Sequence, residues 1–130
     1  MKPIISLGLL CAAALVAGCA SSTSKGTGGR ELTIVRPASQ TLHRGQTNRV
    51  AIVVRRENIP SNVTIQFDQL PKGVSVVEAD RKVQPGELGV DYTLVAANDA
   101  DLVANHQARV TAKAPDGLSA SETLTLTVKQ

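Results

Sequence analysis

From residue 31 onward, apolar and polar residues alternate along the chain with a period of two. This period is typical of β-strands that turn one face toward a core. No stretch after residue 30 has the i, i+3, i+4, i+7 spacing of an amphipathic helix. The pattern predicts about seven strands, around the apolar positions Leu32–Val35, Val50–Val54, Val63–Phe67, Val74–Val76 with a short edge piece at Val83, Val90–Ala96, Ala108–Ala114 and Leu124–Val128.

Turn-forming residues separate these segments, at positions 44–46, 58–61, 70–73, 84–86 and 115–117. In the last of them, Pro115 presets φ for the first central position and Gly117 can adopt positive φ. We therefore expect a hairpin between the last two strands. Short strands with turns every 8–12 residues indicate an all-β fold, an antiparallel β-sandwich.

The start of the chain has a different pattern. Lys2 supplies positive charge, and Ile4–Ala17 is a 14-residue stretch without a charge. Such a stretch is too short for a membrane-spanning helix, which needs about 20 apolar residues. A positive start, an apolar run and a small-residue exit predict a secretory signal peptide over residues 1–18.

The apolar run ends in Val16-Ala17-Gly18-Cys19. This tetrapeptide resembles the lipobox of bacterial lipoproteins. The resemblance implies cleavage between Gly18 and Cys19 and attachment of lipid to Cys19, which anchors the protein to a membrane of the bacterial cell envelope. Ala20 stands where an Asp would imply retention at the inner membrane, which points to the outer membrane. An ordinary cleaved signal with an incidental Cys19, or an uncleaved anchor, are the alternatives.

Residues 19–30 are rich in Ser, Thr and Gly, and we expect a lipidated cysteine followed by a flexible linker. Residues 31–130 are then one small domain. Cys11 belongs to the predicted signal peptide, so after cleavage the domain would have no disulfide.

The domain resembles the Ig-like sandwich modules of bacterial envelope and secreted proteins. The resemblance rests on four pieces that occur in order. They are a turn glycine before the second strand (42–46), a valine-rich segment (50–56), a Leu-Pro-x-Gly-Val element (70–74) and Pro85-Gly86 before the fifth strand. It implies an Ig-like antiparallel β-sandwich that acts as a spacer, scaffold or binding surface. The chain lacks tryptophan and a sandwich cysteine pair, so the resemblance extends to the general architecture and not to antibody-type domains. Phe67 and Tyr92 are the only aromatics, which predicts an aliphatic core.

The sequence offers little for catalysis or metal binding. No nucleophile-elbow, metalloprotease or phosphate-loop motif occurs. His43 and His106 stand apart from other ligand types, and a zinc site needs three or four converging groups. The segment Asn98–Asp101 is the densest carboxylate group; turn formation explains it, and calcium binding is the alternative. We expect no enzyme activity and no cofactor.

Charge is distributed unevenly. Residues 30–72 hold seven basic and three acidic residues, whereas residues 73–130 hold five basic and eight acidic ones. Arg49, Arg55 and Arg56 gather around the second strand. The favoured interpretation is strand-edge charge that discourages edge pairing; the alternative is contact with an anionic partner, such as lipid headgroups. Nucleic acid is not an expected partner, because single-strand binding uses aromatic platforms that this chain lacks.

These observations predict a membrane-anchored envelope lipoprotein with a non-catalytic interaction or scaffold role. Its expected partners are the membrane, through the lipid, and another envelope protein. The alternative is a ligand-binding lipoprotein that presents a glycan, peptidoglycan or a metal to an envelope machine.

Overall fold

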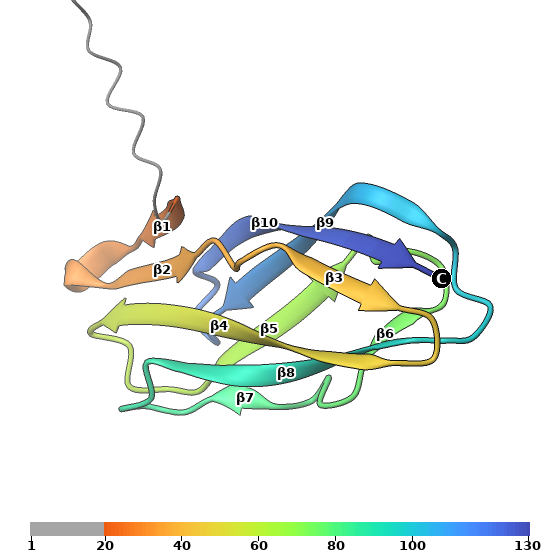
Figure 1. Cartoon of the computed structure of the whole chain (residues 1–130). Helices are drawn as coiled ribbons and strands as arrows, with labels where there is room; N and C mark the ends of the chain where they lie inside the picture. The colour runs from red at the N-terminus through yellow and green to blue at the C-terminus, as the bar shows by residue number, and fades with distance from the viewer. Residues whose placement is uncertain (1–19) are drawn as a thin grey trace, which may run out of the picture.

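The computed structural model describes residues 20–130, which form two β-sheets packed face to face (Figure 1). The predicted signal peptide and Cys19 lie outside the described residues. The strands are β1 (Ser21–Lys25), β2 (Glu31–Val35), β3 (Gln40–His43), β4 (Thr47–Glu57), β5 (Val63–Asp68), β6 (Val74–Val76), β7 (Lys82–Val83), β8 (Gly89–Ala96), β9 (Val103–Lys113) and β10 (Ser119–Lys129), with a single 3-10 turn η1 (Thr27–Gly29).

The strand order is that of an Ig-like sandwich. One sheet runs β1-β2-β4-β8-β6 and the other β3-β10-β9-β5-β7. Within them, β2-β4-β8-β6 and β10-β9-β5 reproduce the ABED and GFC orders of immunoglobulin domains. All paired strands are antiparallel except β3, which pairs in parallel with β10. The expected fold class is confirmed.

Each of the seven predicted strands is present, and the edge piece at Val83 is strand β7. The predicted hairpin joins β9 to β10: Gly117 has φ of 98°, and Ala114 N donates to the Leu118 carbonyl at 2.8 Å. Two strands, β1 and β3, were not predicted. Both are short and carry almost no apolar residues, so their hydrophobic pattern gives no signal.

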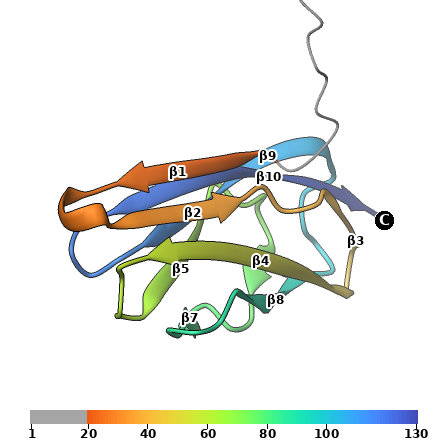
Figure 2. The ribbon, with the colours of Figure 1, turned by 90° about the vertical axis from the view of Figure 1, so that its left-hand side faces the viewer.

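The prediction of a flexible linker over residues 19–30 is wrong for its described part. Ser21–Lys25 form strand β1, which pairs along its whole length with β2 (Figure 2). The chain then turns back through η1, where Gly28 and Gly29 adopt positive φ. The Ser-rich composition predicted a flexible segment, but backbone pairing with an existing sheet can order such a segment even when it has no core side chains of its own.

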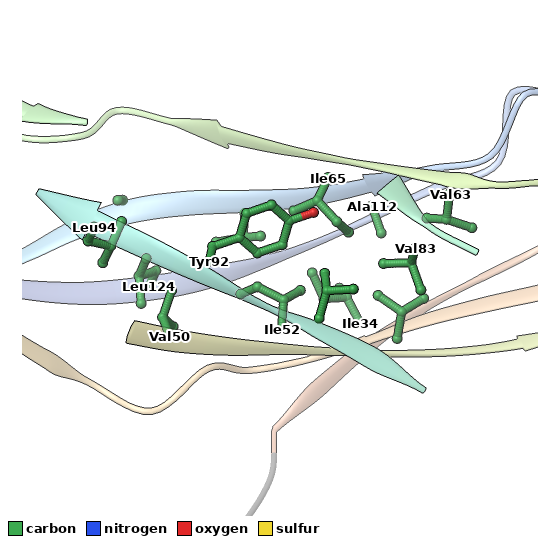
Figure 3. Packing of buried hydrophobic residues seen from close by; sticks show 14 of the residues in the cluster. Ile34, Val50, Ile52, Val63, Ile65, Val83, Tyr92, Leu94, Ala112 and Leu124 are labelled. Carbon is green, nitrogen blue, oxygen red and sulfur yellow. The ribbon is translucent and has the colours of Figure 1, made fainter. Parts of the chain in front are cut away.

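The core is aliphatic, as expected, with one aromatic exception. Tyr92 on β8 is fully buried among Val, Ile, Leu and Ala side chains from both sheets (Figure 3). Its ring meets Phe67 edge to face, with ring centroids 5.2 Å apart. Phe67 itself is only partly buried, and it packs against the margin of the core. Tyr92 is therefore the larger contributor to core packing.

Candidate functional site

The three arginines singled out from the sequence do not form one patch. Arg49 and Arg55 point outward from the same face of β4, but six residues separate them, which is about 20 Å along a strand. Arg55 lies in a shallow hollow that Glu31 and Glu57 also line, and these two glutamates are direct cross-strand partners. Two carboxylates beside Arg55 weaken its attraction for an anion. Contact of Arg49 or Arg55 with an anionic partner stays a prediction.

Arg56 also has a structural role. It sits on the opposite face of β4 from Arg55 and is half-buried. Its guanidinium donates to the carbonyls of Ser61 (2.5 Å), Val83 (3.0 Å) and Gln84 (2.8 Å). Burial lowers the pKa of this guanidinium, although the nearby carboxylate of Glu87 acts in the opposite direction. Arg56 thus joins the turn after β4 to strand β7, and it also lines the hollow in which Arg55 lies; its contact with an anionic partner stays a prediction.

A buried carboxylate that the sequence did not reveal fastens β1 to the sandwich. Glu122 on β10 is 8% exposed and lies in the buried row of its strand, between Ala120 and Leu124. Its Oε1 accepts a hydrogen bond from Ser22 Oγ at 2.9 Å, and its Oε2 accepts one from Arg36 Nε at 3.1 Å. Ser22 lies 100 residues before Glu122, so no local pattern could have indicated this contact.

The surroundings of Glu122 keep it ionised. Burial raises the pKa of its carboxyl. Hydrogen bonds from Ser22, Arg36 and the Thr123 backbone, together with the charge of Arg36, lower the pKa by more than burial raises it, so the pKa lies below its usual range. Of the two ion-pair partners, Arg36 is 54% exposed and Glu122 is 7% exposed at the side chain. The cluster ties β1 to β10, and its three side chains also line a polar hollow.

The other sequence candidates are held in turns or bonded to the backbone. The segment Asn98–Asp101 is a turn, and hydrogen bonds to residues outside the segment hold it in place. Arg44 donates to the Ala100 carbonyl at 2.8 Å, and Asp101 N donates to the Lys72 carbonyl at 3.0 Å. His106 bonds to the Gln69 carbonyl at 2.6 Å. Within residues 20–130, no three His, Cys, Asp or Glu side chains come together in a way that could hold a metal ion.

A hollow lies at the open side of the sandwich, between β5 and β6. Its volume is about 490 Å³. Ile65, Phe67, Val74 and Val76 form an apolar floor, and Thr64, Gln66, Leu70, Ser75 and Ala79 complete the lining. None of these residues is charged. We call this hollow the β5–β6 groove.

The segment that closes one end of the groove, residues 77–81, is firmly held. Glu78 accepts hydrogen bonds from the Thr93 backbone N (2.8 Å) and Thr93 Oγ1 (2.9 Å). These bonds, the backbone one foremost, lower the pKa of Glu78. Tyr92 Oη donates to the Arg81 carbonyl at 2.5 Å, and burial raises the pKa of this phenol to about 12. The groove therefore has a fixed rim at this end.

No helix among residues 20–130 is long and apolar enough to cross a membrane. No protein-family model matches the chain, and neither does any curated protein. Among solved structures, the chain is similar to a chimeric titin Z1Z2 functionalized with an exogenous KLER peptide from decorin. The two share 18% sequence identity over 86% of this chain and 97% of the other, with a TM-score of 0.40. The likeness is remote, and the Ig-like assignment rests on the strand order itself.

Proposed function

We propose that this protein is a lipid-anchored bacterial envelope protein whose Ig-like sandwich binds another envelope protein and carries out no catalysis. The observation that carries the proposal is Val16-Ala17-Gly18-Cys19 at the end of an uncharged run. Acylation of Cys19 with two or three chains would hold the protein at the membrane, since each buried methylene contributes about 0.8 kcal/mol. Ala20 after the cysteine favours the outer membrane over the inner one.

The ordered strand β1 makes this anchor a short one. Ala20 alone separates Cys19 from β1, and the Ala20 carbonyl accepts a hydrogen bond from Arg36 N at 2.7 Å. An acyl group at Cys19 would thus place the sandwich directly against the bilayer, without the ten-residue linker that the composition suggested. A partner would have to approach within a domain's width of the membrane surface.

The groups of the described chain favour binding over chemistry. Its buried carboxylate, Glu122, accepts structural hydrogen bonds, and its two histidines lie on β3 and β9, with β10 between them. A ligand-binding role is the second candidate, because the β5–β6 groove is concave. Its apolar, uncharged lining does not suit a metal and offers few groups for a sugar.

Metabolic labelling with palmitate in a Gram-negative host tests the anchor. We expect label on the wild-type protein and none on the Cys19→Ser variant, with the labelled protein in the membrane fraction. A Ser21→Ala variant is the matched control, since it changes a neighbouring hydroxyl and leaves the lipobox intact. An unlabelled wild-type protein, or equal labelling of the Cys19→Ser variant, would overturn the anchor.

The interaction role has a separate test. Crosslinking in intact cells should join the wild-type protein to a specific envelope protein, and the same partner should be recovered in repeated experiments. A protein that stays monomeric and captures nothing under these conditions would contradict the role even where labelling succeeds.

A further inference from the structure

Two strand edges without partners face the β5–β6 groove. Strand β7 covers β5 only at Val63 and Thr64; from Ile65 to Asp68, β5 pairs with β9 alone. On the other wall, β6 pairs with β8 alone. Among residues 20–130, no further backbone hydrogen bond reaches Ile65–Asp68. The groove thus combines open backbone donors and acceptors with an apolar floor.

The open backbone edge and the apolar floor together indicate which kind of molecule the groove can bind. An acyl chain or another hydrocarbon would cover the floor but leave the backbone groups of β5 without partners, which is costly once water is displaced. A polypeptide in extended conformation satisfies them by adding a strand, and its alternate side chains can enter the groove. Because no lining residue is charged, the complementary segment is uncharged as well.

We propose that the β5–β6 groove binds an extended, uncharged segment of a partner protein, which pairs with β5 along Ile65–Asp68 and places a large apolar side chain over Phe67 and Val76. The cavity of about 490 Å³ has room for such a side chain and its neighbours. The proposal deepens the interaction role given above by naming its site, and it does not depend on acylation.

The position of the groove suits a partner that approaches an anchored protein. Strand β1 is at one edge of its sheet and β6 is at the opposite edge, four strand spacings away, or about 19 Å. An anchor attached just before β1 therefore leaves the groove on the far side of the sheet. The partner segment would reach it without displacing the sandwich from the membrane.

A peptide titration of the full chain in lipid nanodiscs tests the proposal. The probe is a capped six-residue peptide of alternating threonine and valine with one central phenylalanine, labelled with fluorescein and followed by fluorescence anisotropy. Empty nanodiscs give the blank for lipid partitioning. The test variant is Ala79→Asp, which puts a charge on an exposed lining position; Val77→Asp, 64% exposed and outside the lining, is the matched control.

We expect saturable binding to the wild-type protein and to the Val77→Asp variant, and at least a tenfold weaker affinity for the Ala79→Asp variant. A second peptide, N-methylated at alternate amides, should also lose at least tenfold, because it cannot pair as a strand. Circular dichroism confirms that each variant is folded.

Three results would overturn the proposal: no binding above the empty nanodiscs, equal binding by the two Asp variants, or undiminished binding of the N-methylated peptide. The last of these would identify the groove as a site for a small apolar ligand. The same titration on the Cys19→Ser variant in buffer without nanodiscs requires only a folded chain, so the proposal is tested apart from the palmitate experiment, and either can fail alone.

Discussion

Replacing Glu122 by glutamine removes the charge that ties β1 to the sandwich and keeps the shape of the side chain. Hydrogen bonds to a charged group contribute about 1.5–3 kcal/mol, and the carboxylate accepts them from Ser22 and Arg36. The Arg36 bond counts for less, because its side chain is 54% exposed and exposed ion pairs contribute about 0–1 kcal/mol. Glutamine keeps one carbonyl oxygen as acceptor. The expected loss at pH 7 is about 1–2 kcal/mol.

The loss should depend on pH in a defined direction. The folded protein holds the pKa of Glu122 below its usual value, so the carboxylate stabilises the fold above the pKa of the unfolded chain. This contribution disappears as the pH falls through the folded pKa. The difference in unfolding free energy between wild type and the Glu122→Gln variant should therefore be largest at pH 7. It should vanish at acid pH, below both the folded and the unfolded pKa.

Thermal unfolding followed by circular dichroism measures the difference, since 1 kcal/mol shifts Tm by about 4–8 °C in a domain of this size. The control is Asp91→Asn, an exposed carboxylate on β8, which should change stability by less than about 0.5 kcal/mol. An unchanged Tm at pH 7, or a deficit that persists at acid pH, would refute the role of the Glu122 charge.

Three further predictions test single contacts. Gly73→Ala should cost more than about 2 kcal/mol in chemical denaturation, because φ is +85° and the new Cβ would lie 2.6 Å from Ala100 Cα; Gly28→Ala, with φ of +75° and open space, should cost clearly less. The tyrosinate absorbance of Tyr92, the only tyrosine, should titrate near pH 12, and stability should fall as the pH rises above about 10, where the unfolded chain ionises. Arg56→Lys should lose about 1–2 kcal/mol in the same denaturation assay despite its unchanged charge, because an ammonium cannot reach three carbonyls as the guanidinium does.

The strands that line the core could be predicted from the sequence because their signal is local. Buried side chains on β4, β8 and β10 fall two residues apart, and all of them are apolar except Glu122. Turn residues such as Pro115 and Gly117 have conformational preferences that do not depend on distant contacts. For the same reason, the all-strand character of residues 31–130 and their aliphatic core followed from residue types alone.

Positions without an apolar pattern were decided by the tertiary structure. Strand β1 exists because β2 offers a backbone edge and Glu122 offers an acceptor for Ser22, and neither is visible in residues 21–25. Alternation along β4 separates Arg55 from Arg56, although they are adjacent in sequence. The β5–β6 groove arises where β7 stops pairing after Thr64.

The sequence by itself determined where strands that face a core would form and where they would turn, whereas lipid attachment at Cys19 stays a prediction. Only the tertiary structure decided which edges pair, which charges meet and which remain open to a partner. The physical reason is one of range. Side-chain periodicity and turn preference act between near neighbours, whereas strand pairing and charge contacts join residues up to 100 positions apart.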